Sequence, residues 1–150
     1  MNIDEYNKLA DSLKPKIPYL KNSIYAFIFG GSIGAFGQFL FNVFVNIMHL
    51  SDDNASALMS VSIVFIASIL TGLGLYDKIA KIAGAGTFVP ISGFANSMTS
   101  AALEAKSEGW VLGIGSNMFK LGGTVITFGI VASTILGVVR YVFTYFGSFI

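Results

Sequence analysis

Cysteine is absent from this 150-residue sequence, and histidine occurs once, at His49. Without cysteine the chain forms no disulfide, offers no thiolate chemistry and has no cysteine-based metal site. Charged residues are also scarce, at 11% of the sequence compared with about 25% in ordinary soluble domains. The formal net charge is +1 and no basic run is present, so nothing suggests a nucleic-acid partner. These absences argue against an enzyme, a cofactor site and a metal centre.

Long apolar stretches take the place of the missing charge. Hydrophobic residues make up 54% of the sequence, and the mean hydropathy is +0.74. Uncharged stretches separate Lys21 from Asp52, Asp53 from Asp77, Lys81 from Glu104, and Lys120 from Arg140. Each stretch matches or exceeds the roughly 17–25 residues that a helix needs to cross the hydrocarbon core. The sequence therefore predicts an all-α polytopic membrane protein, with the lipid bilayer as its first partner.

The chain is expected to begin with a tail, residues 1–22, outside the membrane. A short amphipathic helix is predicted over residues 2–14 of this tail, because apolar side chains fall near one helix face. Asn2 can cap this helix, Glu5 occupies the reciprocal capping-box position, and Pro15 ends it. The alternative interpretation is a weakly ordered tail.

A single membrane domain, residues 23–150, is expected to follow, with about four transmembrane helices. The predicted spans cover residues 23–48, 55–76, 82–103 and 121–139. The first two are joined by a short link and should form an antiparallel hairpin, whereas the third is expected to be broken or re-entrant. A further short helix over residues 109–120 is an alternative.

The distribution of Lys and Arg predicts the orientation, because cytoplasmic loops carry an excess of these residues. The tail carries Lys8, Lys14, Lys16 and Lys21, the first link carries Asp52 and Asp53, and the second link carries Lys78 and Lys81. The N-terminus is therefore expected in the cytoplasm, with the first link outside and the second inside. A full crossing by residues 82–103 would leave the C-terminus inside, and a re-entrant segment would leave it outside. Arg140 favours the full crossing.

The first span carries a stripe of small and amide residues at four-residue steps: Gly30, Gly34, Gln38, Asn42 and Asn46. Amides are costly in lipid unless they meet a partner or water, so this amide stripe should face protein or a wet cavity. In one interpretation Gly30 and Gly34 form a close-packing contact and the amides bond between helices. In the other, Gln38, Asn42 and Asn46 line a polar pathway. His49 ends the span and is interpreted as an interface residue, because the sequence has no second histidine.

The third apolar stretch contains a predicted helix break. Pro90 lacks an amide hydrogen and disfavours a helical residue before it, and Gly84, Gly86 and Gly93 flank it. A new helix is expected after the break, ended by Gly109. Its polar residues include Ser92, Asn96, Ser97, Thr99 and Ser100. The start of such a helix can meet an anion within the membrane, or the segment can be a tightly packed kinked helix in a purely structural subunit.

Several residues mark the ends of the predicted spans. Amphipathic rings favour the headgroup level, which is where Tyr19, Tyr25, Tyr76, Trp110 and Tyr141 are expected. Lys120 stands at the head of the last span. By default it extends its ammonium group to the membrane interface, and the alternative is a cation that lines an anion path.

Two consecutive segments, VPISGFANSMTSAALEAKSEG and WVLGIGSNMFKLGG, resemble the small membrane proteins of the stage V sporulation A group. The resemblance is strongest from Gly72 to Gly129. It implies an integral protein of the inner membrane of the bacterial spore. It also implies a channel subunit, with mechanosensitive gating, that moves dipicolinic acid with calcium into the developing spore and out during germination. The implied partners are a paralogue, stage V sporulation protein AE, and the soluble protein AD, which binds dipicolinate.

For the candidate residues, the resemblance supplies a solute, since dipicolinate is a small, flat dianion. The helix start near Gly93, the polar groups of Ser92, Asn96, Ser97, Thr99 and Ser100, and Lys120 would then stabilise it in passage. Such a site should bind weakly, because conduction requires exit as well as entry. One chain with about four spans is small for an enclosed path, so an oligomer or a paralogue is expected. The alternative is a non-conducting scaffold that recruits the dipicolinate-binding partner.

Overall fold

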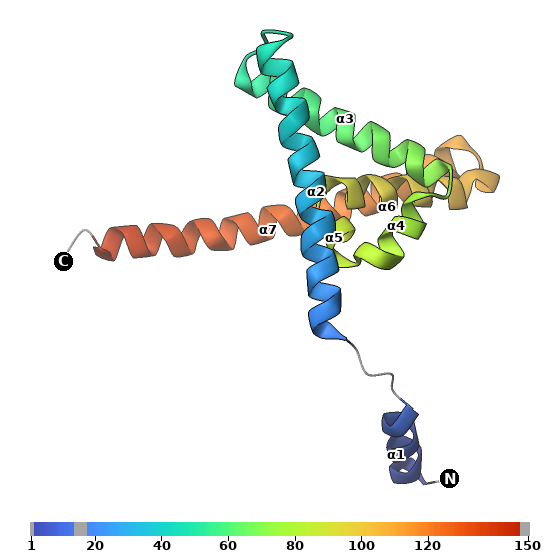
Figure 1. Cartoon of the computed structure of the whole chain (residues 1–150). Coiled ribbons are helices and arrows are strands. Elements are labelled where there is room, and N and C mark those ends of the chain that lie inside the picture. Colours follow the sequence, from blue (N-terminus) through green and yellow to red (C-terminus); the bar gives the residue numbers. More distant parts are fainter. Residues whose placement is uncertain (1, 14–17, 148–150) are drawn as a thin grey trace.

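The computed structural model in Figure 1 describes residues 2–13 and 18–147. All regular elements in these ranges are helical, which confirms the predicted all-α class. In chain order they are α1 (Ile3–Leu13), α2 (Tyr19–Asn46), α3 (Asp52–Gly72), α4 (Tyr76–Ala83), α5 (Ala85–Phe88), α6 (Ile91–Glu104) and α7 (Ser116–Gly147). A 3-10 turn (Ala105–Glu108) and a π-helical turn (Trp110–Gly115) connect α6 to α7.

The predicted N-terminal helix is present as α1, and it stands apart from the other helices in Figure 1. The backbone amide of Asn2 donates to Oε2 of Glu5 at 3.2 Å, as the capping-box position predicts. The side chain of Asn2 accepts from the amide of the next residue at 2.9 Å. Pro15, which was expected to end this helix, lies outside the described residues, as do Lys14 and Lys16.

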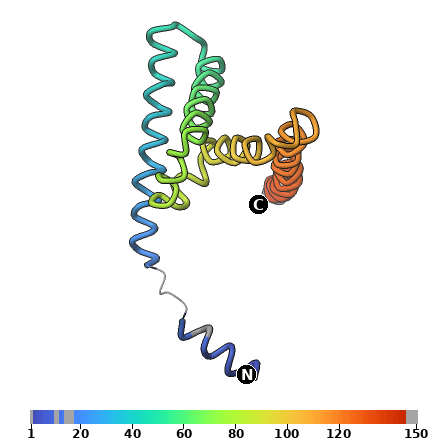
Figure 2. The backbone as a smooth tube through the Cα atoms, turned by 90° about the vertical axis from the view of Figure 1, so that its right-hand side faces the viewer, coloured from blue at the N-terminus to red at the C-terminus, as the bar shows by residue number. Residues whose placement is uncertain are grey.

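Helices α2 and α3 form an antiparallel hairpin, as their short link predicts: they run beside each other in the view of Figure 2 and diverge away from the link in that of Figure 1. Small residues allow the two helices to approach. Gly37 of α2 is buried, and a Cβ atom added there would lie 3.3 Å from Cδ1 of Ile63 in α3. Apolar side chains gain little by leaving lipid for protein, so membrane helices are held together by close packing, here of the Ile63 side chain on the backbone of Gly37.

Helix α4 follows the hairpin and ends at Gly84, whose φ of 52° is a left-handed conformation that glycine adopts readily. Helix α5 then makes backbone contact with α2. A Cβ atom on Gly86 would overlap the carbonyl oxygen of Ala26, and one on Gly30 would lie 3.4 Å from the carbonyl oxygen of Gly86. Gly34 faces open space within the described chain, so the predicted Gly30–Gly34 pair makes one close intrachain contact instead of two.

The third apolar stretch is broken between α5 and α6. Helix α5 ends at Phe88, Pro90 is extended with a ψ of 162°, and α6 begins at Ile91. The 14 residues of α6 rise about 21 Å, which is short of the roughly 30 Å of hydrocarbon that a span must cross. Helix α6 alone is therefore too short to cross. The 3-10 turn continues it to Gly109, whose φ of 91° ends it as expected.

The last helix is longer than the span predicted for it. Helix α7 has 32 residues, and the preceding π-helical turn joins it without interruption, so residues 109–120 do not form a separate helix. The turn is marked by the bond from the amide of Ile114 to the carbonyl oxygen of Gly109, at 3.0 Å. In Figure 1, α7 runs beside α6 and then extends beyond it, across the direction of the hairpin.

Three helical segments of the described chain are long and apolar enough to cross a membrane: Tyr19–Asn46, Asp52–Gly72 and Trp110–Tyr145. They overlap the first and second predicted spans, which were expected to reach residues 48 and 76, and contain the last one, and they confirm the helical membrane class. The buried apolar residues are mostly alanine: Ala55, Ile63, Ala67, Tyr76, Ala83, Ala95 and Ala105. A core this small fits a protein whose larger apolar side chains face lipid or other subunits.

Candidate functional site

The helix break is held by close backbone contact. The amide of Gly93 donates to the carbonyl oxygen of Pro90 at 2.9 Å, which closes the first turn of α6. A Cβ atom on Gly93 would lie 2.6 Å from the carbonyl oxygen of Phe88, closer than real Cβ contacts come. Pro90 supplies the extended residue that starts α6, and Gly93 supplies the space for α5 to fold back on it.

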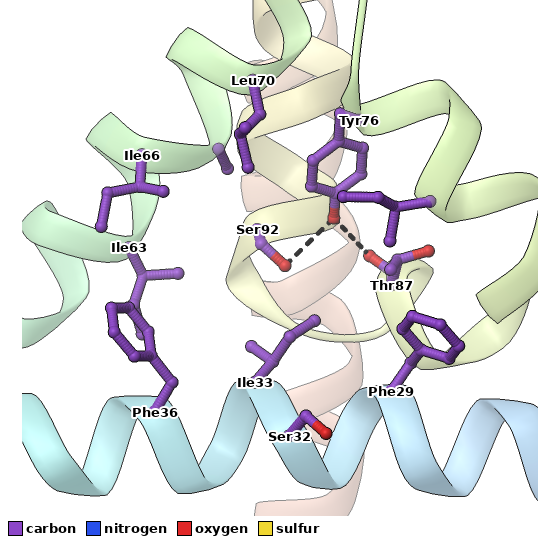
Figure 3. A pocket seen from close by; sticks show the side chains of 12 residues that line it. Phe29, Ser32, Ile33, Phe36, Ile63, Ile66, Leu70, Tyr76, Thr87 and Ser92 are labelled. Carbon is purple, nitrogen blue, oxygen red and sulfur yellow. Dashed lines mark hydrogen bonds between the residues drawn. The ribbon is translucent and has the colours of Figure 1, made fainter.

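Tyr76 connects three segments around this break, as Figure 3 shows. Its hydroxyl oxygen lies 2.9 Å from the carbonyl oxygen of Thr87 and 3.1 Å from Oγ of Ser92. A hydroxyl carries one proton, so Tyr76 donates to the carbonyl and Ser92 donates to Tyr76. All three residues are buried, with exposures of 5%, 2% and 4%. The bonds therefore brace α4, α5 and α6 against one another away from water.

Asn96 joins α6 to α3. Its Oδ1 atom lies 2.8 Å from Oγ1 of Thr71, and the same hydroxyl lies 2.7 Å from the carbonyl oxygen of Ala67. Thr71 has one proton to donate, so both contacts are satisfied when the amide is turned to place its nitrogen towards Thr71. In either orientation the amide finds its partner on a neighbouring helix of the same chain.

The other polar residues of α6 have more local surroundings. The hydroxyl of Ser97 donates to the carbonyl oxygen of Gly93 at 3.1 Å, along its own helix. Thr99 is half-buried and Ser100 is exposed. Lys120 is exposed on the first turns of α7, where its carbonyl oxygen accepts a bond from Thr124 at 2.6 Å. None of these residues shares a hydrogen bond with Ser92 or with Asn96 in the described chain.

The amide stripe of α2 lies on the outside of the described chain. Gln38, Asn42 and Asn46 are all exposed, and the side chain of Gln38 donates to Oδ1 of Asn42 at 3.0 Å along the same helix. The predicted bonds from these amides to another helix are absent from the described chain. The amide stripe and the polar residues of α6 are therefore separate groups, because α6 packs chiefly on α3 and α7.

A cavity of about 240 Å³ lies between the hairpin and the braced break (Figure 3). Its walls are mainly apolar side chains: Phe29, Ile33, Phe36, Ile63, Ile66, Leu70 and Ile79. The polar residues in the wall are already paired, since Ser32 donates to the carbonyl oxygen of Ile28 and Tyr76 bonds Thr87 and Ser92. The cavity thus suits an apolar occupant and offers no cation to a dianion.

Metal ligands are not gathered anywhere in the part of the chain that the structure describes. No three His, Asp or Glu side chains there come close enough together to hold a metal ion. Asp52 and Asp53 lie exposed in the first turn of α3, where carboxylates interact favourably with the helix dipole.

Residues 22–139 match the family of SpoVAC/SpoVAEB sporulation membrane proteins. The chain belongs to this family. Stage V sporulation protein AC of Bacillus subtilis (strain 168) is 48% identical over 143 residues, which are 95% of this chain and 95% of that protein. No solved structure matches the chain. The resemblance to the stage V sporulation A group is confirmed, and the chain is a membrane protein of sporulation.

In this SpoVAC/SpoVAEB family member, the structure adds residues that sequence reasoning missed. Tyr76 was expected only as a ring at a span end, and the structure shows in addition that it is buried at the break, where its hydroxyl bonds Thr87 and Ser92. Thr71 carried no expectation, yet it is the partner of Asn96. The only signal in the sequence was the presence of hydroxyl residues in and beside apolar spans, where each such group needs a partner.

Proposed function

We propose that this sporulation membrane protein is a subunit of a channel that carries dipicolinic acid with calcium. The channel would carry the solute into the developing spore and, during germination, outward across the spore inner membrane. Membership of the SpoVAC/SpoVAEB family supports a membrane role in sporulation. The solute follows from the resemblance to the stage V sporulation A group, and the soluble protein AD and the paralogue AE are the proposed partners.

The exposed amide stripe of α2 is the observation that carries the channel role. Leaving a polar group unpaired in an apolar medium costs roughly 2–7 kcal/mol. The bond between Gln38 and Asn42 satisfies one donor and one acceptor, and an amide side chain has two donors and an acceptor to satisfy. Because Tyr19–Asn46 is apolar enough to span a bilayer, water or another subunit must cover these amides. A wet path beside α2 meets this need.

Such a path would lie between subunits. The cavity inside the chain is apolar and its polar wall residues are paired, so it does not suit a dianion. Residues Gly123–Tyr145 of α7 are all exposed, which also favours an assembly with further copies or with the paralogue AE. We place the tail, residues 1–22, in the cytoplasm. Residues 23–150 form the membrane domain, in which α5 and α6 make a broken or re-entrant third segment.

A non-conducting scaffold is the second candidate, and one observation favours it. Ser92 and Asn96, the motif residues proposed to meet the solute, are paired with Tyr76 and Thr71 of the same chain. Their bonds account for their polarity without a passenger. In that case the protein would assemble the complex and recruit the dipicolinate-binding partner, and another subunit would form the pore.

Flux through proteoliposomes tests the proposal. Vesicles loaded with calcium dipicolinate would contain the chain alone or with the paralogue AE, and release would be read as terbium–dipicolinate luminescence. We expect Asn42→Leu to reduce release while the assembled complex keeps its size, because the substitution removes a polar group from the path. Phe39→Leu is the matched control, since Phe39 is also exposed on α2 but lies off the amide stripe. Absence of flux from both preparations would favour the scaffold.

A further inference from the structure

The N-terminal part of α2 meets α4 and α5 (Figure 1), and residues of these three helices line a partly polar cavity of about 340 Å³. Tyr19, Asn22 and Ser23 of α2 form one wall, and Lys81 and Ile82 of α4 form the other. The described lining therefore presents an ammonium group, an amide and two hydroxyls, and it contains no carboxylate. This combination of donors suits a singly charged oxyanion.

A second cavity, of about 390 Å³, adjoins the first along α2. The two cavities share Ala26 and Ala85 in their walls, and the second is completed by Gly30, Gly86, Val89 and Pro90. None of these side chains is polar. The residues of α2 that line the pair, from Asn22 through Ala26 to Gly30, advance about two helical turns from the end of the helix. The pair therefore forms a groove that is polar at its mouth and apolar further in.

The polar mouth is placed at the end of a candidate span. Helix α2 begins at Tyr19, and the ammonium group of Lys21 lies 5.8 Å from the centre of the Tyr25 ring. Tyrosine and lysine at such a position mark the level of the lipid headgroups. The apolar part of the groove then extends from that level towards the acyl chains.

We propose that this groove binds an anionic phospholipid. Its phosphate would accept bonds from Lys81, Asn22 and Ser23, and one acyl chain would lie over Ala26 and Gly30 against α5. A free anion would use the polar mouth but would gain nothing from the apolar extension. The bound lipid would span the contact between Gly86 and Ala26, and it would thereby brace the broken helix against α2. This site shares Gly30 with the amide stripe but contains none of its amide side chains, and it does not depend on the proposed channel role.

Lipid retention and thermal protection test this site in the full chain, purified in a neutral detergent. We expect phosphatidylglycerol to remain bound in native mass spectra and to raise the unfolding midpoint, and phosphatidylcholine and inorganic phosphate to do much less. Lys81→Gln should weaken phosphatidylglycerol binding about tenfold, the effect of losing one charge-assisted hydrogen bond. Lys78→Gln is the matched control, because Lys78 is exposed on the same helix and lies outside the groove.

A second variant addresses the apolar part of the groove. Ala85 is exposed in the wall that the two cavities share, so Ala85→Leu should occupy the path of the acyl chain and reduce retention of phosphatidylglycerol while leaving Lys81 in place. Equal loss in Lys78→Gln and Lys81→Gln would overturn the proposal, since binding would then follow net charge alone. Equal protection by inorganic phosphate would also overturn it in favour of a free-anion site.

Discussion

Replacing Tyr76 with phenylalanine would remove one oxygen atom and keep the aromatic ring, which extends from α4 and packs against α3 and α6. Two groups would lose their partner: the carbonyl oxygen of Thr87, at 2.9 Å, and the hydroxyl of Ser92, at 3.1 Å. Tyr76 is 5% exposed and Ser92 is 4% exposed, and the cavity that they border is lined mainly by apolar side chains, so no other described side chain there replaces the missing hydroxyl. The substitution therefore isolates the contribution of these two bonds to the broken helix.

The expected magnitude follows from what each group can do afterwards. Ser92 is the second residue of α6, so the break leaves it no preceding turn of its own helix whose carbonyl could accept its hydroxyl, unlike Ser62 and Ser97. The Thr87 carbonyl is fixed, and a buried polar group left unpaired costs about 1–3 kcal/mol. We expect Tyr76→Phe to lower the free energy of unfolding by about 1–3 kcal/mol. Ser92→Ala should cost at most about 1.7 kcal/mol, the upper range for single bonds between membrane helices.

Reversible unfolding in mixed detergent, followed by circular dichroism, would measure both variants and the double variant. Because Tyr76 and Ser92 share one bond, their effects should be less than additive by at least about 0.5 kcal/mol. Tyr25→Phe is the control, since Tyr25 is 37% exposed on α2 and its hydroxyl has no role at the break. A Tyr76→Phe variant as stable as the wild type, or full additivity, would refute the bracing role of Tyr76.

Three further substitutions, one of them paired with a control, test the packing around the break. Gly86→Val would drive a side chain into the carbonyl oxygen of Ala26 and should lower the free energy of unfolding by about 1–3 kcal/mol or more. Gly34→Ala is the control: Gly34 faces open space, so this substitution should leave the free energy of unfolding unchanged. Gly93→Ala should expose the break to limited proteolysis, because its Cβ atom has no room; unchanged cleavage rates would contradict the contact. Asn96→Leu should lower the unfolding midpoint, and loss of flux at an unchanged midpoint would instead indicate contact with the solute.

Local features of the sequence predicted the helices and the break well. Hydropathy locates the long helices because an apolar run of that length is typical of a membrane-spanning helix. Pro90 predicts the break because its missing amide hydrogen acts within one turn. The expected restriction on the residue before it was wrong, since Val89 keeps helical angles (φ −76°, ψ −41°) and Pro90 itself is the extended residue. Gly109 ends its helix in a left-handed conformation for an equally local reason. Each of these predictions rests on the backbone of a few consecutive residues.

The contacts between segments were not predictable in the same way. Tyr76 bonds residues 11 and 16 positions away, and no periodicity in the sequence connects them. Gly30 and Gly34 were both candidates for close packing, but only Gly30 meets another backbone in the described chain, because the turn at Gly84 brings Gly86 against this part of α2. The joining of residues 110–115 to α7 through a π-helical turn is likewise decided by packing, since Gly113 lies against the carbonyl oxygen of Ala105.

The polar residues within the apolar segments form two groups, which differ in where their hydrogen-bond partners lie. Ser92 and Asn96 belong to the strongest motif, yet they bond within the chain, so every copy needs them to keep α6 in place whether or not a solute passes. Gln38 and Asn42 form the weaker pattern, yet they face outward from an apolar span and bond only along it. Exposing such groups to lipid costs free energy, so they need hydrogen-bond partners from whatever surrounds α2. A change at Asn42 should therefore reduce flux and leave both the size of the complex and the unfolding of the single chain unaltered, whereas a change at Asn96 should lower the stability of the single chain.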